Sequence, residues 1–214
     1  MIKNIIFDLD GTLLDTSEGI LESVKYAASV IGYPDLPEET WLKFIGPPVQ
    51  NSFMEYYGCS EEEAQEAADI FRDYYKDIAL LKAKPYEGIY ELCEALKANG
   101  FKMAVATYKR EDYALKLLNH FSFNEYCISM HGADNSNVLK KEDIIRMCQS
   151  EMNASNDDSV LIGDTIHDAL GAEKSYTPFL AVTYGFGFKN KDDVKGYQNI
   201  GIADSPKEIA DILL

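Results

Sequence analysis

Two aspartates near the start of the chain have the spacing of a nucleophile and a proton-transfer group. Asp8 and Asp10 follow a short apolar run, residues 5–7, which is typical of a buried parallel strand that ends in a loop. Gly11 permits a sharp turn there, so both carboxyl groups can face one site at the end of the strand. An ionised aspartate attacks phosphorus to form an acyl phosphate, and a neighbouring carboxylic acid protonates the departing alkoxide. The pair therefore indicates phosphoryl transfer.

A second acidic segment favours a divalent cation at the same place. Asp164 and Asp168 follow an apolar run at residues 160–162, so in a parallel sheet they open on the same edge as Asp8, where ligands bind in open α/β sheets. Converging carboxylates repel one another, and a hard cation with oxygen ligands relieves that repulsion. Octahedral Mg²⁺, which keeps water ligands and binds substrate phosphate, fits this set better than Ca²⁺ or Zn²⁺. We therefore expect a Mg²⁺ cofactor.

Two further residues have the chemistry to bind phosphoryl oxygens. Thr107 ends a strong strand pattern and places a hydroxyl group and nearby backbone amides at the same edge. Lys140 and Lys141 precede a helical pattern that begins at Glu142, and one of the two can neutralise negative charge on phosphoryl and carboxylate oxygens. The spacing to Glu142 and to the apolar residues of that helix favours Lys140.

The elements that must position these residues alternate between strand and helix, apart from one insertion. Residues 17–81 contain helical patterns without a convincing strand and interrupt a β–α alternation. We therefore predict an α/β fold: a doubly wound parallel sheet formed by residues 1–16 and 82–214, with residues 17–81 as a small α-helical domain hinged at its two crossings. Further strands are expected at residues 102–107, 126–130, 160–163 and 179–183, and a last helix near residues 206–214.

The composition excludes several classes of function. The 214 residues carry a formal net charge of −16, which opposes docking on nucleic acid or on an anionic membrane, because such binding depends on basic residues. The N-terminal apolar run is too short for a signal peptide, and no apolar stretch reaches the ~20 residues of a membrane helix. The four cysteines lack the spacing of a redox pair or a zinc site. We expect a cytoplasmic monomer or homodimer whose partner is a small phosphorylated metabolite.

The segment 8–12, Thr107, Lys140 and the segment 163–168 occur in an order that resembles the haloacid dehalogenase (HAD) superfamily, in its phosphatase branch with a helical cap. The resemblance covers the whole chain and implies a Rossmann-like HAD core. Asp10 separates this chain from the dehalogenases proper, which favours phosphate ester hydrolysis over cleavage of a carbon–halogen bond.

The resemblance also implies a role for each motif residue. Asp8 is the nucleophile, Asp10 is the general acid and base, and Thr107 and Lys140 bind the phosphoryl group. Mg²⁺ is the implied cofactor. Its implied metal site is formed by Asp8, Asp10 through its backbone carbonyl, Asp164 and, indirectly or through water, Asp168.

One segment and one further residue bear on how the substrate and its phosphate are bound. Phe44-Ile45-Gly46-Pro47-Pro48 is similar to the cap segment of phosphoglycolate phosphatase and nucleotidase-like members, which implies a substrate contact at Gly46. A rigid turn between helices explains the same residues. Tyr108 stands where similar phosphatases commonly have an asparagine, so the hydrogen bonding around the phosphate is expected to differ here.

The leading hypothesis is a Mg²⁺-dependent phosphatase that hydrolyses a small phosphate monoester, such as 2-phosphoglycolate, through an aspartyl-phosphate intermediate. The alternatives within the superfamily are a 5'-nucleotidase and a β-phosphoglucomutase-like phosphosugar mutase, which uses the same two acids but returns the phosphoryl group to a sugar. A signalling receiver is disfavoured by the order of the motifs. A catalytically silent phosphate binder is disfavoured because it needs no pair like Asp8 and Asp10.

Overall fold

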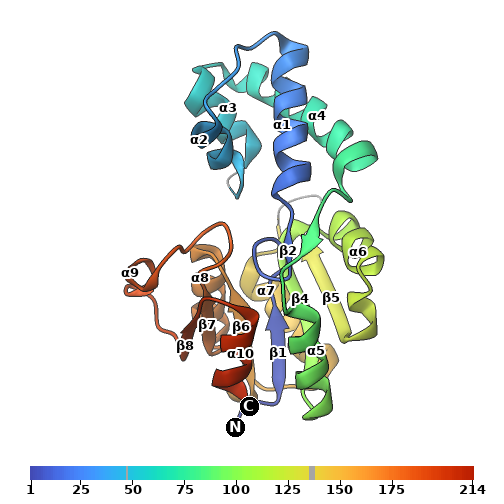
Figure 1. The fold of residues 1–214 in the computed structure, drawn as a ribbon, viewed down its shortest axis with the longest axis vertical. Helices are drawn as coiled ribbons and strands as arrows, with labels where there is room; N and C mark the ends of the chain where they lie inside the picture. The colour runs from blue at the N-terminus through green and yellow to red at the C-terminus, as the bar shows by residue number, and fades with distance from the viewer. Residues whose placement is uncertain (47, 135–137) are drawn as a thin grey trace. The chain divides into compact units, whose positions relative to one another are not determined.

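The computed structural model describes residues 1–46, 48–134 and 138–214. The chain divides into two compact units, which we call the core unit and the helical unit. Met1–Asp15 and Pro85–Leu214 form the core unit, and Thr16–Lys84 forms the helical unit. Figure 1 shows the elements of each unit along the chain.

A parallel sheet forms the centre of the core unit. Within the described part of the chain it has six strands in the order β5-β4-β1-β6-β7-β8, and each neighbouring pair is parallel. The predicted doubly wound parallel sheet is therefore confirmed. The short last strand, β8, was not expected from the sequence. The strands are β1 (Asn4–Phe7), β4 (Lys102–Arg110), β5 (Cys127–Ala133), β6 (Ser159–Gly163), β7 (Phe179–Val182) and β8 (Gly201–Ala203).

Helices cover both faces of this sheet, as expected for β–α alternation. Helices α5 and α10 pack together on one face, and α7 and α8 pack together on the other (Figure 1). The helices of the core unit are α5 (Ile89–Ala98), α6 (Glu111–His120), α7 (Lys141–Met152), α8 (Ile166–Ser175), α9 (Lys191–Val194) and α10 (Pro206–Leu213), with 3₁₀ turns at Phe123–Glu125 and Asn156–Asp158.

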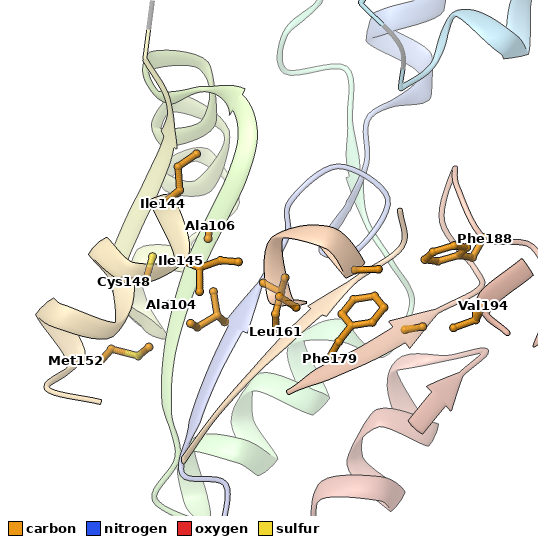
Figure 2. Packing of buried hydrophobic residues seen from close by; sticks show 14 residues of the cluster. Ala104, Ala106, Ile144, Ile145, Cys148, Met152, Leu161, Phe179, Phe188 and Val194 are labelled. Atoms are coloured by element: carbon orange, nitrogen blue, oxygen red, sulfur yellow. The ribbon is translucent and has the colours of Figure 1, made fainter. Parts of the chain in front are cut away.

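Apolar side chains of α7 fix that helix on the sheet. Ile144, Ile145 and Cys148 lie on one face of the helix because residues three or four positions apart share a face. All three are completely buried, together with Leu161 of β6. Figure 2 shows these side chains packed between the helix and the strands. The first residue of α7 is thereby held at a defined place beside the sheet.

The helical unit has a hydrophobic core of its own. Trp41, Phe44 and Phe53 are buried in one cluster with alanines of α4. Ser60 and Glu63 form the capping box that starts α4. The elements of this unit are α1 (Ser17–Ile31), α2 (Glu38–Trp41), α3 (Val49–Tyr57) and α4 (Glu61–Tyr74), with a 3₁₀ turn at Leu42–Phe44 and a π-helical turn at Tyr75–Ala79.

Two short strands, β2 (Leu14–Asp15) and β3 (Lys84–Pro85), pair where the chain passes between the units. All four cysteines are free thiols. Among the described residues, no helix has the length and hydrophobicity that crossing a bilayer requires.

Candidate active site

A lysine from α7 joins two buried aspartates at the carboxyl edge of the sheet. The Nζ atom of Lys141 lies 2.6 Å from Asp8 Oδ1 and 2.6 Å from Asp168 Oδ1. Asp8 directly follows β1, and Asp168 lies in the first turn of α8, which follows β6. Because β1 and β6 are parallel neighbours, their carboxyl ends bring the two acids together. All three side chains are at least nine-tenths buried.

The lysine beside the two aspartates is Lys141, whereas the sequence favoured Lys140. Lys140 is the N-cap residue of α7 and is exposed, whereas Lys141 is the first residue of the helix and is buried. Successive helical residues point about 100° apart, so only one of two adjacent lysines can face the sheet edge. Gly171 of α8 makes room for it, because a Cβ atom there would lie 2.5 Å from Lys141 Cγ.

Burial and neighbouring charges change the pKa of the Lys141 ammonium group in opposite directions. Burial by itself lowers the pKa of Lys141, but the charges of Asp168 and Asp8 outweigh it and raise that pKa above its ordinary value. The ammonium group therefore stays charged. It supplies positive charge beside Asp8.

Backbone amides hold Asp164 by one oxygen. Its Oδ2 atom accepts hydrogen bonds from the amides of Phe186, at 2.6 Å, and Gly187, at 3.0 Å. The backbone at Gly11 and Gly185 also lies close to Asp164, since an added Cβ at either glycine would lie 2.4 Å from Asp164 Oδ2. The buried Oδ1 atom has no hydrogen-bond partner among the described residues. Asp164 thus presents one fixed oxygen with free lone pairs.

Three acids of this site can hold a metal ion. Asp8, Asp164 and Asp168 each offer a carboxylate oxygen, and these atoms lie within 4.8 Å of one another. Burial raises the pKa of Asp8 to about 8, with the charges of Asp168 and Asp164 adding to the effect and Lys141 opposing it. Burial, together with Asp168, raises the pKa of Asp164 to about 7. The unpartnered oxygen of Asp164 and this excess of negative charge fit a hard divalent cation.

Asp168 has both of its oxygens engaged. Its Oδ1 atom pairs with Lys141, while its Oδ2 atom accepts hydrogen bonds from the amide and the hydroxyl group of Thr165. The Thr165 contacts form the capping box of α8. Asp168 therefore starts the helix and orients Lys141 with the same carboxyl group.

Asp10 and Thr107 meet at a second lysine. The Nζ atom of Lys109 lies 3.1 Å and 3.2 Å from the two Asp10 oxygens. The amide of Lys109 donates a hydrogen bond to the buried hydroxyl oxygen of Thr107, at 3.1 Å. Sequence reasoning missed Lys109. Its only signal was a basic residue two positions after Thr107.

This geometry agrees with the comparison to known families. A family model described as "Haloacid dehalogenase-like hydrolase" matches residues 5–182 of the chain. The chain belongs to the haloacid dehalogenase-like hydrolases. The predicted family and the predicted hydrolase class are thereby confirmed.

Individual relatives of this HAD-like hydrolase carry phosphatase names. A protein named 5'-nucleotidase from Pseudomonas aeruginosa is 36% identical over 197 residues, which cover 91% of this chain and 88% of that protein. A phosphoglycolate phosphatase from Agrobacterium fabrum is 29% identical over 189 residues, covering 85% and 80%. The chain is also similar to a predicted phosphatase from Clostridium acetobutylicum whose crystal structure is known. The two sequences are 38% identical, the match covers 99% of this chain and 97% of that protein's chain, and the TM-score is 0.86.

Tyr108 gives this HAD-like hydrolase a contact between two motifs. Its hydroxyl group accepts a hydrogen bond from the backbone amide of Lys141, at 2.9 Å. Its ring meets that of His167 edge to face, with centroids 5.6 Å apart. The residue that departs from the family pattern therefore touches the first residue of α7.

The predicted substrate residue Gly46 lies in the helical unit, between the turn at Leu42–Phe44 and α3. Its φ is +106°, a conformation that favours glycine, and an added Cβ would meet nothing within 4 Å. Pro47 of the same segment lies outside the described residues. A substrate contact at Gly46 stays a prediction.

Proposed function

We propose that this HAD-like hydrolase is a Mg²⁺-dependent phosphatase that hydrolyses a small phosphate monoester through an aspartyl phosphate on Asp8. The observation that carries the proposal is the arrangement around Asp8. Its buried carboxylate lies 2.6 Å from the Lys141 ammonium group and within 4.8 Å of carboxylate oxygens of Asp164 and Asp168. A nucleophilic carboxylate between a fixed cation and a metal-binding set suits attack on phosphorus.

The reaction proceeds in two transfers. An Asp8 oxygen forms a bond to phosphorus while the bond from phosphorus to the leaving oxygen breaks, and Asp10 gives its proton to that oxygen. A water molecule then gives its proton to Asp10 and attacks the same phosphorus atom. Inorganic phosphate leaves and the Asp8 carboxylate is restored. Lys141 and Thr107 offset charge on the phosphoryl oxygens during both transfers.

The residues present fit Mg²⁺. Asp8, Asp164 and the backbone carbonyl of Asp10 would hold the ion, and Asp168 would support the site through Lys141. When bound, Mg²⁺ supplies positive charge against the carboxylates and the phosphoryl oxygens. The unpartnered Oδ1 atom of Asp164 supports this assignment, because a buried carboxylate oxygen without a donor is costly in the absence of a cation.

The proposed substrate is 2-phosphoglycolate or a similar small metabolite, and the second candidate is a nucleoside 5'-monophosphate. Relatives named phosphoglycolate phosphatase and 5'-nucleotidase support these two candidates. We assign the helical unit the role of a cap that excludes bulk water and selects the substrate, with Gly46 in the selecting segment. A phosphosugar mutase remains the alternative that uses the same acids.

Phosphate release with and without Mg²⁺ tests the proposal. The panel contains 2-phosphoglycolate, nucleoside monophosphates and sugar phosphates, with Asp8→Asn as the inactive variant and Asp157→Asn, at an exposed aspartate, as the matched control. We expect Mg²⁺-dependent release that Asp8→Asn abolishes. Mass spectrometry of quenched wild-type enzyme should find one phosphoryl group on Asp8.

Two results would contradict the proposed function. Substantial turnover by Asp8→Asn would remove the nucleophile from the mechanism. Conversion of a sugar phosphate into its isomer without release of phosphate would identify a mutase.

A further inference from the structure

We propose that Lys109 is a positioning residue that holds the Asp10 carboxyl group where it exchanges protons with the leaving group and with water. The inference rests on the proposed function. Lys109 contacts both Asp10 oxygens, at 3.1 Å and 3.2 Å, and its side chain is only 8% exposed. An ammonium group shared by both oxygens fixes the orientation of the carboxyl group.

An irregularity in β4 directs Lys109 toward Asp10. The register between β4 and β5 shifts between Ala106 and Arg110, so the stretch of β4 that carries Thr107 and Lys109 departs from regular pairing. Such irregularities occur next to active sites, where they re-aim a side chain. The amide of Lys109 is also held by the Thr107 hydroxyl oxygen, at 3.1 Å. Thr107 and Lys109 therefore keep a fixed spacing.

Strand β5 packs against the backbone that follows Lys109. A Cβ atom at Gly132 would lie 2.5 Å from the Lys109 carbonyl oxygen and 2.6 Å from Glu111 Cα, so only glycine permits this approach. The Gly132 amide donates a hydrogen bond to the Glu111 carboxylate, at 3.2 Å. The backbone from the Lys109 carbonyl group to Glu111 is thus packed closely against β5, which makes the position of the Lys109 ammonium group reproducible.

Asp10 itself needs such support. It lies in a turn beside Gly11, whose φ is +83°, and its side chain is 24% exposed. A partly exposed carboxyl group has several accessible rotamers. Proton transfer demands hydrogen-bond distance to the reacting oxygen, so restricting Asp10 to one rotamer raises the fraction of productive complexes.

If Lys109 positions Asp10, the loss of kcat/KM in a Lys109 variant should depend on the leaving group of the substrate. If Lys109 binds the phosphate directly, that loss should be the same for every leaving group. An alkyl phosphate needs a proton on its departing oxygen, whereas p-nitrophenyl phosphate loses a stable phenolate that needs none. The value of kcat/KM covers the steps through departure of the leaving group. For Lys109→Met we expect kcat/KM to fall at least about tenfold more for the alkyl ester than for the aryl ester. Lys109→Arg keeps a positive charge and should lose less activity on the alkyl ester than Lys109→Met. Lys116→Met, at an exposed lysine of α6, should leave kcat/KM for both esters unchanged.

A double-mutant cycle and a pair of crystal structures complete the test. If Lys109 acts through Asp10, Lys109→Met causes no further loss in an Asp10→Asn background. The crystal structure of Lys109→Met should show the Asp10 side chain in a changed rotamer or in several rotamers, with the fold intact. That comparison needs no turnover, so it shows whether Lys109 holds Asp10 even where the proposed function fails.

Three results would overturn the inference: equal losses on the two esters, additive losses in the double variant, or an unmoved Asp10. Equal losses would make Lys109 a phosphate-binding residue.

Discussion

The hydroxyl group of Tyr108 accepts a hydrogen bond from the backbone amide of Lys141, at 2.9 Å. The first amides of a helix have no partner within the helix, so this contact satisfies one of them in α7. The same contact ties the segment after Thr107 to the residue that faces Asp8. Two motifs that are far apart in the sequence are thereby held in register.

Removal of this hydroxyl group should loosen Lys141. For Tyr108→Phe we expect the free energy of unfolding to fall by about 1 kcal/mol, the net contribution of one hydrogen bond. We also expect kcat/KM for phosphate release to fall severalfold, because the ammonium group is then less well oriented. Denaturant unfolding and steady-state kinetics measure the two effects. Tyr176→Phe, at a tyrosine that is 79% exposed, is the matched control. An unchanged Tyr108→Phe enzyme would show that α7 is fixed without this contact.

The two adjacent lysines should differ sharply in their effect on activity. Lys141→Met removes the cation between Asp8 and Asp168, so phosphate release should fall at least about 100-fold. The metal-free protein should also lose about 3 kcal/mol of stability, because two buried acids lose their partner. Lys140→Met changes an exposed residue and should alter stability by less than about 0.5 kcal/mol. Equal losses of activity in the two variants would contradict the assignment.

The acidic site should make the metal-free protein less stable as the pH rises. Asp8 and Asp164 have pKa values raised from 3.8 to about 8 and about 7, so the folded protein keeps protons that the unfolded chain has lost. Their contribution is complete below about pH 4 and disappears as the pH rises to about 8, at no more than about 1.4 kcal/mol per pH unit for each group. Mg²⁺ should reverse the loss, because it binds the ionised carboxylates.

Thermal unfolding between pH 5 and pH 8, in a chelator and in Mg²⁺, measures this effect. Asp164→Asn is the matched variant, and its metal-free pH dependence should be shallower than that of the wild type. Carboxyl groups with lowered pKa values, such as Glu22 and Asp158, titrate below this range. A wild-type stability that rises with pH relative to Asp164→Asn would contradict the prediction.

A close approach inside the helical unit gives a prediction about stability alone. A Cβ atom at Gly19 of α1 would lie 2.3 Å from the Ala79 carbonyl oxygen. Alanine normally favours a helix over glycine by about 1 kcal/mol, but a contact this short forces the backbone apart. We expect Gly19→Ala to destabilise the protein by about 1–3 kcal/mol in thermal or denaturant unfolding. Gly196→Ala, where a Cβ would meet nothing within 4 Å, should change stability by less than about 0.5 kcal/mol.

Local sequence determined the framework of the core unit. The apolar runs before Asp8 and Asp164 are buried strands, because a strand covered on both faces requires continuous apolar residues. Parallel pairing of β1 with β6 then makes the two acidic segments converge, as the sequence predicts. The short strand β8 gave no such signal, since only one of its three residues is buried.

The tertiary structure decided which polar groups meet. Lys140 and Lys141 are chemically identical in the sequence, and only the packing of α7 on the sheet selects the one that faces Asp8. Lys109 contacts Asp10 from a stretch of β4 where the register with β5 shifts, and Asp164 is held by amides of Phe186 and Gly187 more than twenty residues away. Strand periodicity follows from neighbouring residues, whereas these contacts depend on rotations and register shifts of single residues. Such details are fixed only when the whole core packs.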